Sequence, residues 1–144
     1  MADDAVPCPL CGAKNRVPRS APGLPRCGSC ETALPWIVEA GETDFDEVTT
    51  SSILVLVDLW APWCSPSVTM APSVVRAAAD LAGLVKVVTV DVSEAPGVAA
   101  KLGVRSVPAL LLLRDGQVVD RHIGGVPGER LDGWIRQAGV ATRG

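Results

Sequence analysis

An almost unbroken apolar run over residues 53–60 constrains the fold of this 144-residue chain more than any other segment. The run is rich in β-branched residues and contains one charged residue, Asp58, which is typical of a strand buried on both faces of a sheet. In the segment that follows, residues 65–82, small and apolar residues recur every three or four positions. This spacing predicts a helix that packs on the sheet, and Pro72 is expected to kink it. A buried strand that passes into a packed helix indicates an α/β fold.

The remaining C-terminal sequence alternates between strand and helix patterns. Further strands are expected at 86–92, 110–113 and 117–123, and further helices at 43–48, 95–102 and 128–138. Thr43 is expected to cap the first of these helices, and Asp115-Gly116 is a turn signal between the last two strands. The predicted order is α-β-α-β-α-β-β-α, which describes a central mixed sheet flanked by helices.

The N-terminal segment has a different composition. Residues 1–35 are rich in proline and hold four of the five cysteines, and a segment this short cannot build a hydrophobic core of its own. We therefore expect a small module at residues 1–35, a connector at 36–42 and a main domain at 43–142.

The four N-terminal cysteines have the spacing of a zinc site. They form two Cys-x-x-Cys pairs separated by fifteen residues: Cys8, Cys11, Cys27 and Cys30. Four thiolates complete a tetrahedral shell without an open position, so the Zn²⁺ would be structural. Gly12 and Gly28 are expected to permit the tight turns of the two pairs. A pair of disulfides and an iron–sulfur site are the alternatives.

Charge and hydropathy disfavour several classes of protein. The net charge is −3 and no basic stripe is present, so nucleic acid is not an expected partner. No apolar run approaches the ~18 residues of a membrane span. The acidic N-terminus lacks the apolar stretch of a secretory signal, which predicts a cytoplasmic protein with reduced cysteines.

The fifth cysteine lies where the first buried strand gives way to the helix. At a helix N-terminus, free N–H groups and the macrodipole favour the thiolate form of Cys64. A Cys-x-x-Cys motif at this place would be a thiol–disulfide exchange motif, but its fourth position is Ser67. One sulfur can therefore attack a disulfide, and no second sulfur follows it to resolve the product.

Three stretches of the sequence together resemble the thioredoxin family. Residues 56–64 resemble its active-site approach with a Trp-Cys-x-Pro core, residues 104–108 its cis-proline loop, and residues 114–119 its terminal hairpin. The resemblance covers residues 43–140. With the N-terminal cysteines added, the whole chain is similar to the zinc-carrying bacterial thioredoxins of the thioredoxin 2 group. This implies a thioredoxin fold with an N-terminal zinc ribbon.

The resemblance also implies roles for individual residues. Cys64 would be the nucleophile, Ser67 stands at the position of the resolving cysteine, and Asp58 is the buried acid that assists that second thiol. The other implied site residues are Pro108 at the catalytic loop and, for substrate binding, Trp63, Ser65, Pro66, Val107 and Gly124. The implied partners are disulfide-containing client proteins, with thioredoxin reductase or glutathione as the reductant.

The chain departs from the family pattern at positions besides Ser67. Thr89 stands where a lysine usually neighbours the buried acid, and Val68 stands where a basic residue is common. The site therefore fits a natural monothiol protein that uses glutathione as an external thiol, or a substitution that traps mixed disulfides. A module that binds client peptides without turnover is the alternative. A purely structural role is disfavoured because Cys64 is retained.

Overall fold

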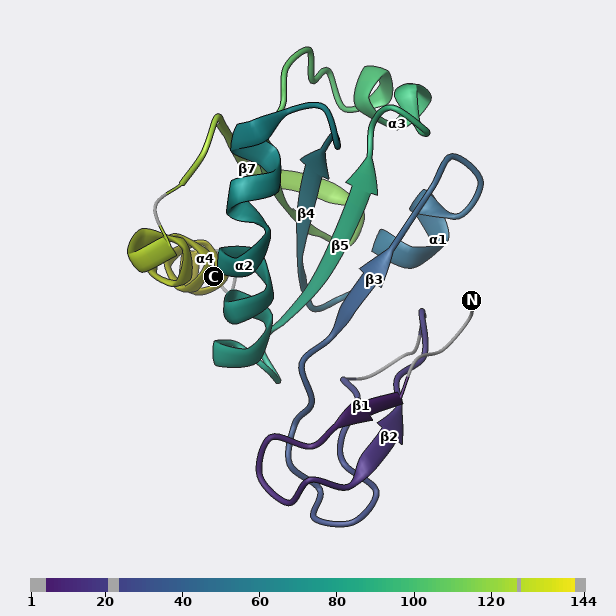
Figure 1. Cartoon of the computed structure of the whole chain (residues 1–144), viewed down its shortest axis with the longest axis vertical. Coiled ribbons are helices and arrows are strands. Elements are labelled where there is room, and N and C mark those ends of the chain that lie inside the picture. Colours follow the sequence, from purple (N-terminus) through teal and green to yellow (C-terminus); the bar gives the residue numbers. More distant parts are fainter. Residues whose placement is uncertain (1–4, 21–23, 127, 142–144) are drawn as a thin grey trace.

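The computed structural model describes residues 5–20, 24–126 and 128–141. Five strands form one mixed sheet in the order β3-β5-β4-β6-β7. Their bounds are Ile37–Glu39 for β3, Leu54–Trp60 for β4, Val85–Asp91 for β5, Ala109–Arg114 for β6 and Gln117–Ile123 for β7. The helices are α1 (Phe45–Thr49), α2 (Ser65–Asp80), α3 (Pro96–Lys101) and α4 (Gly128–Ala141). Figure 1 shows α2 and α4 lying over one face of the sheet.

The central strand explains the apolar run in the sequence. β4 pairs with β5 in parallel and with β6 in antiparallel orientation, so it has neighbours on both sides. Residues 54–59 are all buried, because helices cover both faces of the sheet at this strand. A strand in this place cannot show the alternation of apolar and polar residues that half-exposed strands have.

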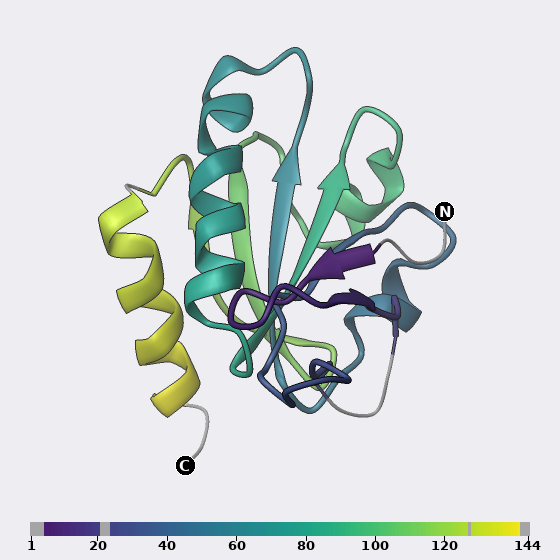
Figure 2. The same cartoon turned by 60° about the horizontal axis from the view of Figure 1, so that its bottom comes forward.

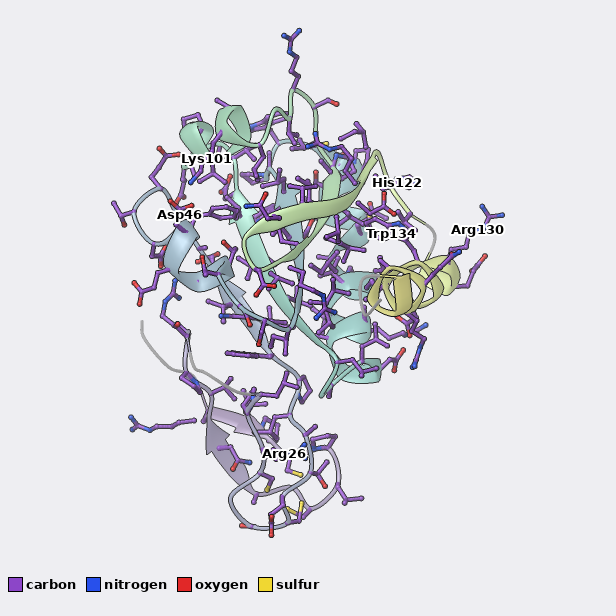
Figure 3. All side chains as sticks on the ribbon, turned by 180° about the vertical axis from the view of Figure 1, so that it is seen from behind. Arg26, Asp46, Lys101, His122, Arg130 and Trp134 are labelled. Carbon is purple, nitrogen blue, oxygen red and sulfur yellow. The ribbon has the colours of Figure 1, made fainter. Side chains whose placement is uncertain are left out.

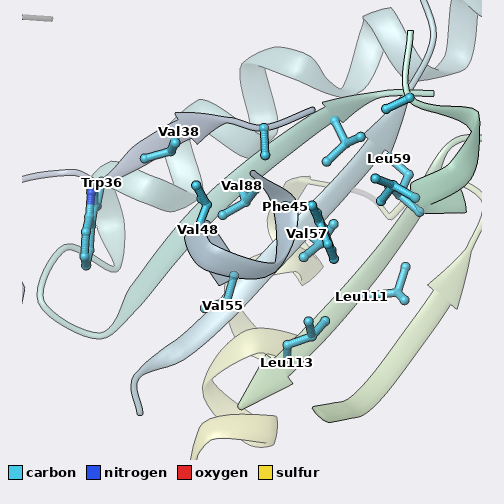
Figure 4. Packing of buried hydrophobic residues seen from close by; sticks show 14 of the residues in the cluster. Trp36, Val38, Phe45, Val48, Val55, Val57, Leu59, Val88, Leu111 and Leu113 are labelled. Atoms are coloured by element: carbon cyan, nitrogen blue, oxygen red, sulfur yellow. The ribbon is translucent and has the colours of Figure 1, made fainter. Parts of the chain in front are cut away.

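Two hydrophobic cores lie on opposite faces of the sheet. On one face, Phe45 and Val48 of α1 pack against β-strand residues that include Val57 (Figure 4). On the other face, Val74 of α2 and Leu131 of α4 belong to a second cluster. Successive side chains of β4 point alternately into the first and the second core. A shift of one residue would therefore exchange the two sets of side chains, so this alternation fixes the register of the sheet.

The predicted mixed sheet with flanking helices is confirmed, with two local differences. The pattern does not predict β3, which pairs in parallel with β5, because three residues are too few to show a period. The prediction that Thr43 caps the first helix is wrong, since α1 begins at Phe45 and Asp44 holds the N-cap position. The Asp44 carboxylate instead accepts the Gly41 N–H at 2.8 Å. Pro72 lies inside α2, which continues to Asp80.

A small antiparallel hairpin precedes the main sheet. Its strands are β1 (Ala5–Pro7) and β2 (Lys14–Arg16), and they pair only with each other among the described residues. Figure 1 shows this hairpin beyond one end of the sheet, whereas the N-terminus of α2 lies at the opposite end. In Figure 2 the hairpin end is turned forward, so the hairpin lies in front of the sheet. The four N-terminal cysteines and Cys64 therefore belong to different ends of the molecule.

A buried lysine anchors the segment after the hairpin to the main domain. Lys86 of β5 is 1% exposed, and its Nζ donates to the carbonyl oxygens of Arg19 at 2.6 Å and Val48 at 2.7 Å. The same Nζ lies 4.3 Å from the ring centroid of Trp36, and the Trp36 Nε1–H donates to the Pro18 carbonyl at 2.7 Å. Burial lowers the pKa of Lys86 to about 8. The main chain at residues 18–19 is thus held by two buried side chains.

We expect Lys86→Met to lower the free energy of unfolding by about 2 kcal/mol, because it leaves two main-chain carbonyls without their donor. Urea denaturation at pH 7 measures the effect. Lys101→Met is the matched control: Lys101 pairs with Asp46 at the surface (Figure 3), and its side chain is 55% exposed. The control is expected to cost less than about 1 kcal/mol. Equal losses in the two variants would contradict a structural role for Lys86.

Candidate functional site

Cys64 occupies the N-cap position of α2 with an extended backbone. Its side chain is half-buried, and the thiol donates to the carbonyl oxygen of Val107 at 3.5 Å. Val107 precedes Pro108 through a cis peptide bond, in the loop that leads into β6. The fold thus brings together two segments that are 43 residues apart in the sequence. The sulfur lies where an incoming chain can reach both it and the main chain of this loop.

The surface around Cys64 is mostly apolar. Trp63 is 71% exposed and Val68 is 48% exposed. Ser65 and Pro66, in the first turn of α2, are also exposed. These side chains surround the sulfur without covering it, which is the arrangement expected of a surface that binds an extended substrate.

Gly124 is brought to the same loop by the last strand. Its N–H donates to the carbonyl of Pro108 at 2.8 Å, directly after β7 ends. The residue has φ +99°, a left-handed conformation that a side chain disfavours. The structure therefore places Cys64, Val107, Pro108 and Gly124 in one continuous set of contacts.

Two polar side chains are buried near this end of the fold without a hydrogen bond. Asp58 of β4 is 4% exposed and Ser67 of α2 is 2% exposed. Neither Asp58 Oδ1 nor Ser67 Oγ has a partner among the described residues. Thr89 is the register partner of Asp58 on β5, so a neutral side chain stands beside the carboxyl. Burial raises the pKa of Asp58 to about 7.

The buried carboxyl makes stability depend on pH. The folded-state pKa of Asp58 lies above its unfolded value, so the folded protein holds this proton more tightly. The associated stability is complete below pH 4 and is lost as the pH rises to about 7. We expect Asp58→Asn to remove this dependence and to be more stable than the parent by about 4 kcal/mol at pH 8. Urea denaturation of both proteins at pH 4.5 and pH 8 measures the difference, and parallel profiles would contradict it.

The four N-terminal cysteines converge on one point. Their Sγ atoms all lie within 4.8 Å of one another, and the shortest separations are 3.5 Å for Cys8–Cys30 and 3.6 Å for Cys11–Cys27. These separations exceed the ~2 Å of a disulfide and lie near the ~3.8 Å between sulfurs of a tetrahedral zinc–thiolate site. The cluster can therefore hold a metal ion, and the sulfur atoms gather in the hairpin region of Figure 3.

Main-chain N–H groups point at the buried sulfurs of this cluster. Cys8 Sγ accepts from Leu10 and Cys11, and Cys27 Sγ accepts from Ser29, each at 3.4 Å. Donors in these positions stabilise thiolates and orient them toward a metal. The donor set and its surroundings thus fit Zn²⁺, which prefers four thiolates in a closed site.

The two cysteine pairs share one backbone design, although their turns differ from the sequence prediction. Gly12 has φ +78° and lies four residues after Cys8, as expected. In the second pair, the left-handed residue is Glu31 at φ 65°, four residues after Cys27. The predicted role of Gly28 is therefore wrong: its N–H instead donates to Asn15 Oδ1 at 2.9 Å.

The single histidine lies apart from both sites. His122 is exposed on β7, and its ring meets that of Trp134 edge-on at 6.1 Å between centroids (Figure 3). Trp134 Nε1 donates to Asp120 Oδ2 at 2.8 Å. Neither contact involves Cys64 or the cysteine cluster.

Comparison with known proteins agrees with the fold. The model of the family described as thioredoxin matches residues 36–137. The chain belongs to the thioredoxin family. Thioredoxin of Haemophilus influenzae is 39% identical over 102 residues, which is 70% of this chain and 95% of the relative. Thioredoxin 1 of Synechococcus elongatus is 51% identical over 81 residues, which is 56% of this chain and 76% of the relative.

Membership of the thioredoxin family makes this protein a thiol–disulfide oxidoreductase by descent. Thioredoxin of Staphylococcus aureus is likewise similar, at 42% identity over 95 residues, 66% of this chain and 90% of the relative. The family match begins at Trp36, so the four-cysteine hairpin lies outside it. Within the described residues, none of the helices has the length and apolarity needed to cross a membrane.

Proposed function

We propose that this protein is a thioredoxin-type protein-disulfide reductase that works with a single active-site cysteine. Cys64 would attack the disulfide of a client protein, and Ser67 would stand in place of the resolving cysteine. The observation that carries the proposal is the position of Cys64. Its half-buried sulfur lies at the N-cap of α2 and within 3.5 Å of the Val107 carbonyl, so an extended client could pair with this loop while its disulfide meets the sulfur.

The proposed reaction needs an external thiol. The Cys64 thiolate attacks one sulfur of the client disulfide, the S–S bond breaks, and the other client sulfur leaves as a thiolate that takes a proton. A glutathione thiolate then attacks the Cys64 sulfur and releases the second client thiol. A second glutathione restores the Cys64 thiolate and leaves as glutathione disulfide, so two glutathione molecules supply the two electrons.

Two observations indicate that the resolving thiol comes from outside the chain. First, the hydroxyl of Ser67 cannot form a disulfide. Second, the other four cysteines cluster in the loops of the β1–β2 region, at the end of the molecule opposite the N-terminus of α2 (Figure 1). We assign client binding to the surroundings of Cys64, namely Trp63, Ser65, Pro66, Val107 and Gly124, with Pro108 holding the loop. Asp58 would be the buried acid of the site, with its pKa raised to about 7 by burial, and with Ser67 in place of the resolving cysteine it has no second thiol to deprotonate.

The N-terminal cysteines would bind one structural Zn²⁺, as in the thioredoxin 2 group. Bound zinc would hold the hairpin loops together, since the four thiolates leave no open position for catalysis. On this proposal, residues 1–35 form the zinc module and residues 43–142 the thioredoxin domain. Residues 36–42 are the connector between them, and this connector also contributes β3 to the main sheet. The partners would be disulfide-containing client proteins in the cytoplasm, with glutathione or thioredoxin reductase as the reductant.

Reduction of insulin by the zinc-loaded protein, with and without glutathione, tests the proposal when intact mass is measured under non-reducing conditions. We expect turnover with glutathione and a one-to-one mixed disulfide without it. Cys64→Ser should show neither. A stable adduct without turnover under both conditions would identify a trap instead of an enzyme. Absence of both adduct and turnover would contradict the enzymatic role and favour a module that only binds clients.

A further inference from the structure

The strand β3 forms an open edge of the main sheet. It is the last strand in the order β3-β5-β4-β6-β7, and its partner is β5. The Trp36 carbonyl and the Ala40 N–H form hydrogen bonds of 2.8 and 2.9 Å with the backbone of β5. In a parallel pair, every second residue directs its peptide groups to the same neighbour. Ile37 and Glu39 therefore direct their peptide groups away from β5, to the open edge.

A groove of about 920 Å³ runs beside this edge, between the N-terminal segment and the main domain. Part of its lining is apolar and comes from Val6, Val17, Ile37, Trp60 and Ala95. Ile37 is 39% exposed, so the strand offers an apolar side chain as well as peptide groups of Ile37 for which the described residues provide no hydrogen-bond partner. The volume lies within the range of binding clefts and admits several residues of an extended chain.

The rest of the groove is strongly acidic. Four carboxylates line it, from Glu39, Asp44, Asp91 and Glu94. Arg19 is the one cation among the described lining residues, and it pairs with Asp44 and donates to the Glu39 carbonyl. The described lining therefore carries a net charge of −3, from four carboxylates and one guanidinium. A basic occupant would be electrostatically complementary to it.

We propose that this groove binds an extended segment of a partner protein that carries both basic and apolar residues, and that the segment adds a strand to the edge of β3. The peptide groups of Ile37 and the N–H of Glu39 supply the hydrogen bonds of the added strand. Ile37 and Glu39 lie two residues apart and therefore project from the same face of β3, so an apolar and an acidic side chain stand side by side along the added strand. The Glu39 carbonyl already accepts a hydrogen bond from Arg19, so the added strand would pair with β3 only as far as the Glu39 N–H.

The groove is separate from the thiol chemistry. Its lining includes neither Cys64 nor any residue that we assign to client binding around that sulfur. Binding in the groove therefore requires no disulfide in the partner, and it should persist when Cys64 is blocked. This independence separates the present proposal from the proposed reductase activity.

The probe is a fluorescein-labelled peptide of about eight residues that alternates lysine with valine, and the measurement is fluorescence anisotropy with the zinc-loaded full chain. We expect saturable binding that weakens as salt rises, because the carboxylates are near the surface. A peptide with glutamate in place of lysine should not bind. A lysine–valine peptide N-methylated at alternate positions should lose most of its affinity, because it cannot donate to the edge of β3.

Two charge reversals locate the site on the protein. Glu39→Lys and Glu94→Lys change exposed lining residues, and each is expected to weaken binding about five- to tenfold at low salt. Glu129→Lys is the matched control, because it makes the same charge change at an exposed position of α4 outside the groove. The control should leave the dissociation constant within about twofold.

Several results would overturn the proposal. The first is that Glu129→Lys weakens binding of the peptide as much as Glu39→Lys and Glu94→Lys do. The second is that the N-methylated peptide binds as tightly as the unmodified one. The third is that alkylation of Cys64 abolishes binding. Binding that appears only after removal of residues 1–4 would assign the groove to the chain's own N-terminal segment. A dimer in sedimentation experiments that Glu39→Lys abolishes and the peptide disrupts would assign it to a second copy of the chain.

Discussion

Replacing Ser67 with cysteine is expected to free the protein from its need for glutathione. The new thiol would lie three residues after Cys64, in the first turn of α2, and would attack the mixed disulfide intramolecularly. Intramolecular attack has a large effective concentration, so we expect insulin reduction with thioredoxin reductase as the only reductant to rise by ~100-fold or more. Turnover assays of the Ser67→Cys variant without glutathione measure the gain.

The fold should accept this substitution without loss. Ser67 is 2% exposed and its hydroxyl has no hydrogen-bond partner among the described residues. A thiol loses less free energy than a hydroxyl when it is buried without a hydrogen bond, because it behaves as a small apolar group. We expect the free energy of unfolding of the reduced variant to stay unchanged or to rise by about 1 kcal/mol. The control is Ser67→Cys combined with Cys64→Ser, which should not turn over. A stable Ser67→Cys protein with no gain in activity would contradict the monothiol mechanism.

Removal of the proposed zinc ion is expected to loosen the N-terminal module and to release its anchor on the main domain. Without the metal, nothing draws the four cysteines together, and a two-stranded hairpin with few hydrogen bonds is too small to be stable by itself. Trp36, which is fully buried against this segment, would then meet water, at a cost of about 3 kcal/mol. We expect chelation to lower Tm by roughly 10 °C and to increase hydrogen exchange in residues 8–34.

A pair of cysteine variants tests the same effect without a chelator. Cys11→Ser removes an exposed member of the cluster and should reproduce the fall in Tm. Cys64→Ser makes the same chemical change at the other end of the molecule and should leave Tm nearly unchanged. If metal analysis finds zinc and its removal leaves both Tm and hydrogen exchange unaltered, the module does not depend on the metal.

The sequence predicts the elements that have a long period and misses those that depend on distant partners. Residues 53–60 and 65–82 show clear patterns, and β4 and α2 follow them closely. The strand β3 is stable because β5 lies beside it, which three residues of local sequence cannot reveal. Asp44 takes the N-cap position, where its carboxylate also accepts from the Gly41 N–H and pairs with Arg19.

The candidate site shows the same division. The four-cysteine cluster could be predicted because fixed spacings between cysteines reflect the geometry of a metal site. Cys64 could be identified by its place between a buried strand and a helix. The contact of Cys64 with Val107 agrees with the resemblance to the thioredoxin family. The burial of Lys86 over Trp36 could not be predicted from the sequence, because lysine in a strand is usually exposed. Nor could it show that the hydroxyl of Ser67 lacks a partner, which depends on packing between α2 and the sheet.

The placement of the tryptophans has an optical consequence. Trp36 is wholly excluded from water and lies beneath the Lys86 ammonium, whereas Trp63 is 71% exposed beside the reactive sulfur. Their indoles should therefore emit at opposite ends of the tryptophan spectrum. A blue-shifted component would follow the state of the cysteine-rich end, and a red-shifted, readily quenched component would follow occupation of the Cys64 surface. One unlabelled protein could thus report on both of its ends in a single fluorescence titration.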